Sequence, residues 1–581
     1  MLNKAASELL DRYADMLEIN GANPFRVRAF RTAARRVDSL TDDLTELAAA
    51  DRLESVPGIG KGIAGFLKEF VTAGRVAEHD ELRRAIPDGV FEMLRIPGVG
   101  TKTVATLFHE LAITGVAELE AAARAGRLAE APGIGAKREA KLLKELERFR
   151  ERTARHPIGE VLPLAEQLLE AIRRAPAVRM AAYAGSLRRM RETIGDLDLL
   201  AASETPAPVM ESFVQAPEVT EVLGHGPTKT SVLVRGGLQV DLLVVPPASF
   251  GAALQYFTGS KEHNVELRGR AQRLGLSLNE FGVLEDASGR RRPCATEAEV
   301  YAAVGLPWIA PELREGRGEL AAAEAAALPA LLTLEDIRGE MHGHSIWSDG
   351  SAPIDAMVRA ARATGYAYVG ITDHSGALQV ANGLSPERLF AQKAEIAQAR
   401  AAHPGFHILH GSEVEILPDG ALDYDDALLA SLDVVVASVH TNFTQSREAM
   451  TERLLRAIRH PHVDVIGHPT GRLLGRRDGY AFDPETVFRA AADTGTALEL
   501  NASPDRLDLN DVHVRRAVEL GAPIAINSDA HDPSHFASMR YGVGTARRAW
   551  LSRAHVLNTL DAAALRAWLG RPKPRRGSLP G

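Results

Sequence analysis

Three aspartates in the first half of the chain have the type and spacing that phosphoryl transfer requires. Asp196 and Asp198 are two residues apart at the start of an apolar run, so both side chains face the same side of a strand. Asp241 lies in another such run, Gln239–Val245. Two divalent cations held by such carboxylates activate a 3′-hydroxyl and neutralise a leaving pyrophosphate. The three residues predict a catalytic nucleotidyl-transfer site that binds two ions of Mg²⁺ or Mn²⁺, in which Asp241 helps to activate the hydroxyl.

A glycine-serine turn precedes the acidic pair. Gly185 and Ser186 open a turn before a helical stretch, where free backbone amides and the helix dipole favour an anion such as a triphosphate. Arg189, with Arg188 as the alternative, supplies positive charge to neutralise it. A lone aspartate is more often a surface or capping residue. The ordered set of turn, arginine and acids instead favours a nucleotide site.

A second set of residues suited to chemistry follows residue 340, where nine His and carboxylate residues stand at the ends of predicted strands. They are His342, His344, Asp349, His374, Glu413, His440, His468, Asp529 and His531. In a parallel α/β barrel the carboxyl ends of the strands converge on one mouth. A single strand-end histidine is more often a core or surface residue, but the recurring set predicts a metal site that admits Zn²⁺, Mn²⁺ or Fe²⁺. The chemistry expected there is hydrolysis of phosphate esters.

The elements that must position these residues change along the chain. After Leu334 a strand-then-helix rhythm repeats, which predicts a parallel α/β barrel. Around the aspartates, short β-type runs alternate with helical stretches. These runs are Val178–Tyr183, Leu197–Leu200, Ser231–Val234 and Val240–Val245. The earlier residues predict short helices broken by glycine-rich turns.

One glycine turn occurs three times in this helical part, in runs that begin at Ser55, Arg95 and Glu130. Each has Pro-Gly-(Ile or Val)-Gly followed by a helix. Such turns approach a partner closely, and free amides at the helix start grip phosphates without reading sequence. The glycines predicted to contact a DNA backbone are Gly58, Gly60, Gly98, Gly100, Gly133 and Gly135. The alternative, plain interhelical turns, is disfavoured by three copies with similar flanks.

Bulk properties limit the class of protein. A chain of 581 residues needs several folding units. Its net charge of −8 argues against uniform coating by nucleic acid but permits local basic surfaces. The single cysteine, Cys294, excludes an internal disulfide or a cysteine-based zinc site and suits a small semi-buried position. No apolar run approaches the ~18 residues that span a bilayer. We expect a cytoplasmic monomer with no membrane partner.

The first half resembles the family X DNA polymerases, over residues 1–318. The shared motifs are the glycine-serine turn, the Gly-Asp-x-Asp run from Gly195, the nucleotide-binding loop Tyr256-Phe-Thr-Gly-Ser260 and the stretch Asn279–Gly282. The resemblance implies gapped or primed duplex DNA and dNTPs as partners. The residues it assigns to the dNTP are Gly185, Ser186, Arg189, Gly195, Tyr256, Phe257, Gly259, Lys261 and Asn264, and it places Arg268 on the template.

After residue 336 the order H-x-H-x4-D…D-H…E…H…H…D-x-H resembles the PHP (polymerase and histidinol phosphatase) domain. The resemblance implies up to three ions, which we expect to be Mn²⁺ or Zn²⁺. It assigns one ion to His342, His344, Glu413 and Asp529, a second to Glu413 with His440 and His468, and a third to Asp349, His374 and His531.

Together the halves are similar to bacterial family X polymerases with a C-terminal PHP domain. The similarity implies a DNA-directed DNA polymerase that fills short gaps in base excision repair, a Mn²⁺-favoured 3′–5′ exonuclease, and room for abasic-site endonuclease and 3′-phosphatase activities. The implied fold is multidomain: a helix-hairpin-helix region, an α+β palm and thumb, and a distorted β/α barrel. The expected divisions are a helical DNA-binding domain at 1–88, a fingers-like domain at 89–150, the palm at 151–248, the thumb at 249–318, a linker at 319–335, the PHP domain at 336–570 and a basic, disordered tail at 571–581.

One position departs from the family. The Schiff-base lysine of its 5′-deoxyribose-phosphate lyase aligns with Phe66, which cannot form a Schiff base. Lys61 and Lys68 lie nearby as substitutes. We therefore expect weak or absent lyase activity. Lys261 replaces an acidic residue of some relatives, and either strengthens nucleotide binding or is simply solvated.

Three other functions stay open at this point. The first half can be a DNA-binding scaffold with a silent transferase, although the intact aspartates argue against this. The PHP half can act on small phosphate esters, although its fusion to DNA-gripping turns argues otherwise. A template-independent transferase is not excluded by any residue pattern.

Overall fold

The computed structural model describes the chain except for residues 1, 39–43, 95, 97–98, 133, 136–137, 145, 147–154, 176, 286, 574–575 and 577–581. Gly98 and Gly133, two of the predicted DNA contacts, lie outside the described residues. The chain divides into two compact units, Met1–Ala154 and Arg155–Gly581. Among the helices that the structure describes, none is long and apolar enough to cross a membrane.

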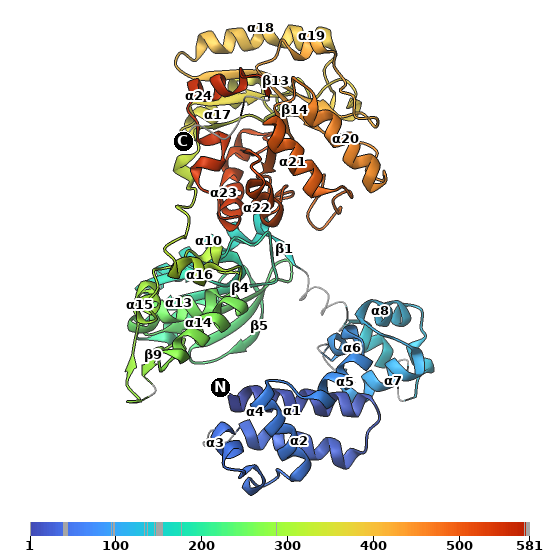
Figure 1. The fold of residues 1–581 in the computed structure, drawn as a ribbon, viewed down its shortest axis with the longest axis vertical. Coiled ribbons are helices and arrows are strands. Elements are labelled where there is room, and N and C mark those ends of the chain that lie inside the picture. Colours follow the sequence, from blue (N-terminus) through green and yellow to red (C-terminus); the bar gives the residue numbers. More distant parts are fainter. Residues whose placement is uncertain are drawn as a thin grey trace. The chain divides into compact units, whose positions relative to one another are not determined.

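The first unit is built from short helices around one apolar core (Figure 1). They are α1 (Leu2–Ile19), α2 (Pro24–Asp38), α3 (Leu44–Ala49), η1 (Leu53–Ser55), α4 (Lys61–Ala73), α5 (Ala77–Ala85), α6 (Asp88–Met93), α7 (Thr101–Leu111), α8 (Val116–Arg124) and η2 (Leu128–Glu130). The glycine turns precede α4 and α7, and Gly60 and Gly100 are the N-cap residues. The turn expected from the sequence therefore recurs as the start of a helix.

The second unit begins with a mixed sheet in the order β2-β4-β7-β6-β5. Its strands are β2 (Met180–Tyr183), β4 (Asp196–Ala202), β5 (Val219–His225), β6 (Lys229–Val234) and β7 (Gln239–Val245). The strands β4 and β7 are parallel, and the other pairs are antiparallel. The helices α10 (Ile158–Arg174) and α12 (Pro206–Val214) share one core with the sheet, and α13 (Phe250–Thr258) packs in a second core. Two short strands, β1 (His156–Pro157) and β3 (Thr193–Ile194), pair beside it, and the one-turn helix α11 (Gly185–Arg188) follows β2.

Four of these strands contain the β-type runs that the sequence predicts, but β5 was not predicted. Its residues are mostly exposed and do not alternate between buried and exposed positions. It lies at the edge of the sheet and pairs only with β6 among the described strands. A strand of this kind has no hydrophobic period to reveal it.

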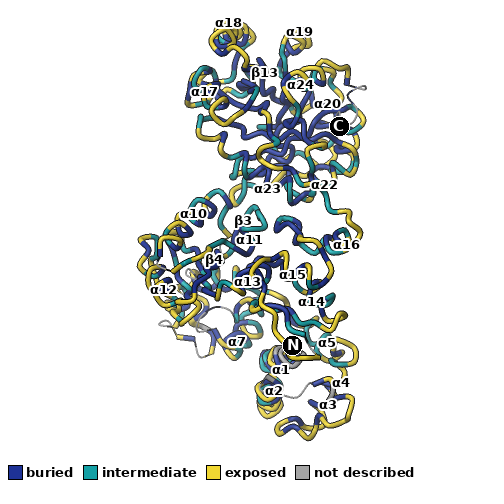
Figure 2. Tube along the Cα trace, turned by 90° about the vertical axis from the view of Figure 1, so that its left-hand side faces the viewer, coloured by how far each residue is buried: buried dark blue, intermediate teal, exposed yellow. Residues whose placement is uncertain are grey.

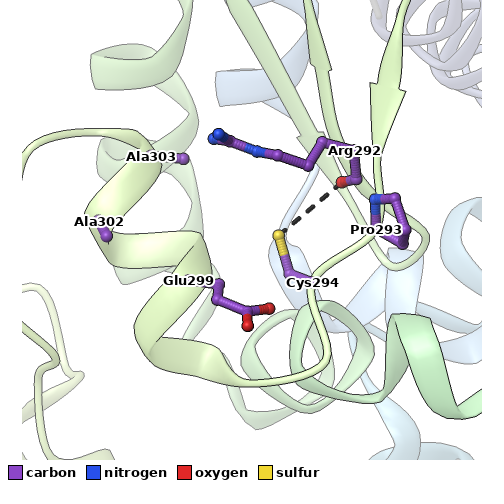
Figure 3. A pocket seen from close by; sticks show the side chains of 6 residues that line it. All are labelled: Arg292, Pro293, Cys294, Glu299, Ala302 and Ala303. Atoms are coloured by element: carbon purple, nitrogen blue, oxygen red, sulfur yellow. Dashed lines mark hydrogen bonds between the residues drawn. The ribbon is translucent and has the colours of Figure 1, made fainter.

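A smaller α/β part follows the palm-like sheet. It contains α14 (Lys261–Arg273), the hairpin strands β8 (Leu276–Asn279), β9 (Gly282–Glu285) and β10 (Arg291–Arg292), and then α15 (Glu297–Ala303), η4 (Pro311–Leu313) and α16 (Glu319–Glu324). Cys294 is buried in its core, where the thiol lies 3.8 Å from the carbonyl oxygen of Arg292 beside a small cavity (Figure 3). This confirms the apolar interpretation of the cysteine. Glu319, expected in the linker, is buried against His263 of α14.

Seven parallel strands in sequential order form the last part, as the strand-then-helix rhythm predicts. They are β11 (Gly339–Glu340), β12 (Tyr368–Ile371), β13 (His407–Glu415), β14 (Val434–Ser438), β15 (Val465–Ile466), β16 (Ala497–Asn501) and β17 (Ile524–Asn527). A parallel bridge between Gly343 and Ala530 brings the first and last strands together, so the barrel is nearly closed. The multidomain fold class expected from the sequence is confirmed.

Helices surround these strands, which are almost wholly buried (Figure 2). The helices are α17 (Ile354–Ala363), α18 (Pro386–Ala402), α19 (Asp426–Leu429), α20 (Arg447–Arg459), α21 (Pro484–Thr494), α22 (Asp511–Glu519), α23 (Met539–Arg548) and α24 (Ala562–Leu569). One core joins the strands to the surrounding helices, and a second joins other strand residues to α24 through Trp568. The barrel thus holds its strand ends rigidly.

The start of the expected disordered tail is packed onto the barrel. Lys573 is buried and donates to the carbonyl oxygen of Ile458 at 2.7 Å. Arg576 pairs with buried Asp464 at 2.8 Å and lies over the ring of Trp568. The prediction of disorder is wrong for these two residues, because their charges find buried acceptors while their stems cover apolar surface.

Candidate active sites

The first candidate site is built where the strands β4 and β7 run parallel. Asp198 and Asp241 are direct register partners, and Asp196 precedes Asp198 on the same face. Burial, together with Asp196 and Asp241, raises the pKa of Asp198 to about 7. Three carboxylates held this closely require cations to be ionised together. A cation already faces them, since the ammonium of Lys229 lies 2.7 Å from an oxygen of Asp241. The donor set therefore fits divalent metal ions.

The glycine-serine turn lies against this acidic group. Gly185 has a φ of +59°, and a Cβ there would lie 2.3 Å from Oδ2 of Asp198. Only glycine allows both the backbone conformation and this close approach. Gly185 starts the one-turn helix α11. The predicted turn thus places backbone amides beside the carboxylates.

A cavity of about 700 Å³ opens in front of the turn. Most of the residues assigned to the dNTP line it: Gly185, Ser186, Arg189, Tyr256, Phe257, Gly259, Lys261 and Asn264, together with Asp196 and Asp198. Gly195, Arg268 and Asp241 are not among its lining residues. The structure also brings Arg155, Arg191, Arg317, Glu262 and Glu315 to the cavity, none of which the sequence analysis identified.

The two candidate arginines have different surroundings. Arg188 is held by both oxygens of Glu297, at 2.7 and 2.8 Å, and by Thr258. Arg189 donates to Glu315 and to the carbonyl oxygen of Thr258 while it lines the cavity. Arg189 is therefore the arginine that can contact a phosphate in the cavity, whereas Arg188 forms a structural ion pair. The sequence alone does not show that Glu297 lies beside Arg188, because the two residues are 109 positions apart. It therefore cannot separate the two arginines.

The nucleotide loop is fixed by its own contacts. The amide of Asn264 donates to the carbonyl oxygen of Tyr256 at 2.8 Å and accepts from Gln255. The rings of Tyr256 and Phe257 are edge to face, with centroids 5.3 Å apart. Arg268 donates to the carbonyl oxygen of Asn264 one turn earlier. These contacts pre-order the loop before a ligand binds.

The second candidate site brings together all nine predicted residues at the carboxyl ends of the barrel strands. Glu413 is central and buried: His374 and His468 approach it to 2.9 Å, and His440 to 3.2 Å. Asp529 lies 3.1 Å from His344. Three groups are compact enough to hold an ion each: His342, His344, Glu413 and Asp529; His374, Glu413 and His440; and His344, Asp349, His374 and His531. The first group matches the expected set. The second has His374 where His468 was expected, and the third adds His344 to the expected set; His468 belongs to none of the three groups, although it contacts Glu413.

Two buried histidine atoms at this site have no hydrogen-bond partner in the described part of the chain. They are Nδ1 of His344 and Nδ1 of His468. Burial and two neighbouring histidines lower the pKa of His344 to about 3, so its imidazole is neutral, as a metal ligand must be. Burial opposes ionisation of Glu413, but the surrounding histidines lower its pKa well below the ordinary value. Unpartnered lone pairs around an ionised carboxylate fit metal ions.

Two glutamates behind these ligands were missed by the sequence analysis. Glu499 on β16 lies 2.8 Å from Nδ1 of His342, and Glu415 on β13 lies 2.8 Å from Nδ1 of His440. Each contact turns the Nε2 atom of its histidine toward Glu413. Their signal was present, because both acids lie within apolar runs that read as strands.

Three of the glycines predicted to contact DNA face open space in the helical unit. A Cβ at Gly60, Gly100 or Gly135 would meet nothing within 4 Å. Gly58 has a φ of +94° and lies against α2. The amides at the starts of α4 and α7 are thus unobstructed for a phosphate backbone. Phe66, by contrast, is buried between Tyr13 and Phe30, with ring centroids 4.8 and 5.3 Å away.

Comparisons with known protein families match four stretches of the chain, in the domain order expected from the sequence. Family models match it as a helix-hairpin-helix domain over residues 1–76, a SAM-like helix-hairpin-helix tandem over 90–148, a DNA polymerase beta thumb over 253–315 and a PHP domain over 340–503. These matches contain the glycine turns, the nucleotide loop and seven of the nine barrel residues.

Three curated relatives cover different parts of the chain. It is 39% identical over 573 residues to the DNA polymerase/3′-5′ exonuclease PolX of Bacillus subtilis (strain 168), which covers 98% of this chain and all of the relative. It is 26% identical to DNA polymerase lambda of Rattus norvegicus, over 48% of this chain and 52% of that protein. A probable phosphatase of Thermoanaerobacter sp. (strain X514) is 29% identical over 41% of this chain and 96% of its own length.

Proposed function

Since the chain belongs to the bacterial family X DNA polymerases that carry a PHP domain, we propose that it fills short gaps during DNA repair and trims 3′ ends at a second site. It is a DNA-directed DNA polymerase and a 3′–5′ exonuclease. One observation carries the proposal: the register partners Asp198 and Asp241 lie beside the Gly185 turn and its nucleotide-sized cavity. Its expected partners are gapped or primed duplex DNA and dNTPs, in the compartment that holds the DNA.

The polymerase half positions the incoming nucleotide. Asp196, Asp198 and Asp241 would hold two ions of Mg²⁺ or Mn²⁺, which would supply activation of the 3′-hydroxyl and neutralisation of the leaving pyrophosphate. The α11 amides and Arg189 bind the triphosphate. Tyr256 and Phe257 support the sugar, since they line the same cavity.

The PHP half hydrolyses phosphodiesters at 3′ ends. Its His and carboxylate groups would hold up to three ions of Mn²⁺ or Zn²⁺, which would supply an activated water and a clamp on the phosphate. Glu499 and Glu415 hold the ligand histidines in one orientation. Because the match to the probable phosphatase of Thermoanaerobacter sp. covers 96% of that protein, we also propose a 3′-phosphatase activity. Phe66 cannot form the Schiff base that lyase chemistry requires.

A gapped duplex with a labelled primer tests both activities. We expect extension with dNTPs and Mg²⁺, and 3′ shortening with Mn²⁺ when dNTPs are left out. Extension without a template strand would instead favour a template-independent transferase. Equal extension by wild type and by Asp241→Ala would contradict the polymerase function and favour a DNA-binding scaffold in the first half.

A further inference from the structure

The barrel and the polymerase part of the second unit meet through ion pairs. In four of them the acid comes from residues 155–318 and the arginine from the barrel: Glu166 with Arg540, Glu192 with Arg472, Glu312 with Arg547, and Glu315 with Arg548. Arg317 and Asp511 form a fifth pair of opposite sense. Of the four acids, only Glu315 also lines the nucleotide cavity. This pair therefore connects the barrel to the site.

Glu315 is a shared acceptor for three arginines. Its side chain is 9% exposed and lies 2.8 Å from Nε of Arg189, 3.4 Å from Nη1 of Arg191 and 2.8 Å from Nη1 of Arg548. Burial would raise the pKa of Glu315, but Arg548 and Arg189 lower it below the ordinary value. The carboxylate is thus a charged and buried counter-ion directly behind the arginine assigned to the triphosphate.

Arg548 holds both the counter-ion and the backbone of Arg189. The same Nη1 atom that contacts Glu315 donates to the carbonyl oxygen of Arg189 at 2.7 Å. Its Nη2 atom donates to Asp511 at 2.9 Å, an acid that Arg317 of the cavity also contacts. Arg548 is only 3% exposed at its side chain. These contacts fix it at the junction of the barrel and the nucleotide cavity.

We propose that Arg548 of the barrel is a positioning residue for dNTP binding: it shares Glu315 with Arg189 and offsets the charge of that carboxylate, which weakens the competition between Glu315 and the triphosphate for Arg189. Without Arg548, the carboxylate of Glu315 holds Arg189 and Arg191 more strongly than it does now, and its less compensated charge repels the anionic nucleotide. The KM for dNTP therefore rises more than kcat falls. This inference rests on the proposed polymerase function.

The test compares two neighbouring arginines on α23. Arg548→Met removes the contact with Glu315, and Arg547→Met removes the same charge one residue earlier, where it pairs with Glu312 at 2.8 Å. On a gapped duplex we expect Arg548→Met to raise the KM for dNTP by roughly tenfold, as for one lost charge-assisted hydrogen bond. Arg547→Met should change it by less than about twofold on the same scale.

A double variant separates positioning from general damage. Adding Glu315→Gln to Arg548→Met removes the charge that competes for Arg189, and we expect the KM to return most of the way to the wild-type value. Binding of a fluorescent dATP analogue to enzyme on a dideoxy-terminated primer should show the same order. If Arg548→Met loses its thermal transition or its 3′ shortening, Arg548→Gln, which removes the charge but keeps a polar side chain, replaces it in the same comparison.

The outcomes distinguish a failure of the proposed polymerase function from a failure of the role of Arg548. A wild-type protein that does not extend the primer contradicts the proposed function itself. A wild-type protein that extends while Arg548→Met and Arg547→Met share one KM overturns the role of Arg548 alone. A loss confined to kcat, or a double variant with no recovery, overturns it as well.

Discussion

Gly185 and Asp198 lie in direct contact: a Cβ at Gly185 would be 2.3 Å from Oδ2 of Asp198. The residue that starts the phosphate-binding turn therefore also sets the position of a catalytic carboxylate. Because Asp198 is the register partner of Asp241, a shift at Gly185 reaches two of the three acids. The triphosphate cradle is therefore packed directly against one of the metal ligands.

Gly185→Ala tests this coupling. We expect kcat/KM for primer extension to fall by at least ~10²-fold, because a misplacement of about 1 Å is enough to disturb the reacting geometry. Gly224→Ala is the matched control, since a Cβ there meets nothing within 4 Å on the same sheet. Extension by Gly185→Ala at the rate of this control would show that the turn and Asp198 are independent.

The acids behind the barrel histidines should govern metal affinity. Glu499→Gln weakens the hold on Nδ1 of His342 and should lower the affinity for Mn²⁺ by about 10–100-fold. Calorimetric titration of metal-free protein measures this directly. Glu335→Gln, at an exposed position of the same part of the chain, should bind as wild type does. An unchanged affinity of Glu499→Gln for Mn²⁺ would show that Glu499 does not support the metal site.

Glu297 should make the second unit sensitive to acid. The carboxylate is buried and pairs with Arg188 and Arg314 at 2.7 Å. Burial alone would raise its pKa, but the two arginines lower it to about 2. A lowered folded-state pKa gives stability that is present above the unfolded value near ~4.5 and is lost as the pH falls toward about 2.

Glu297→Gln should accordingly lower the free energy of unfolding by about 3 kcal/mol at pH 7. The difference from wild type should shrink between pH 5 and 3, which urea unfolding at several pH values can follow. Glu266→Gln, exposed on α14, is the control and should have little effect. A difference that stays constant with pH would mean that Glu297 acts through packing rather than charge.

Lyase activity should be very low. Phe66 occupies the family's Schiff-base position and is packed in an aromatic cluster. Lys68 is exposed and paired with Asp51 at 2.9 Å, and Lys61 is exposed at the start of α4. Borohydride trapping on an abasic substrate should give little adduct. Any adduct that does form should disappear in the double variant Lys61→Arg, Lys68→Arg. Abundant adduct in wild type would contradict this prediction.

The sequence could predict what depends on local order and residue type. The strand positions of Asp196, Asp198 and Asp241 follow from period-two patterns, and the nine barrel residues follow from their places at strand ends. Contacts between distant segments were out of reach. The pairing of Arg188 with Glu297 and of Glu315 with Arg548 spans 109 and 233 residues, and nothing in the local pattern indicates either.

The most direct test of the two-site account is one gapped-duplex assay on three proteins: wild type, Asp241→Ala and His344→Ala. It follows primer extension with Mg²⁺ and dNTPs, and 3′ shortening with Mn²⁺ alone. The account predicts that Asp241→Ala loses extension and keeps shortening, and that His344→Ala shows the reverse. Loss of both activities in either variant, or shortening by His344→Ala at the wild-type rate, would contradict it.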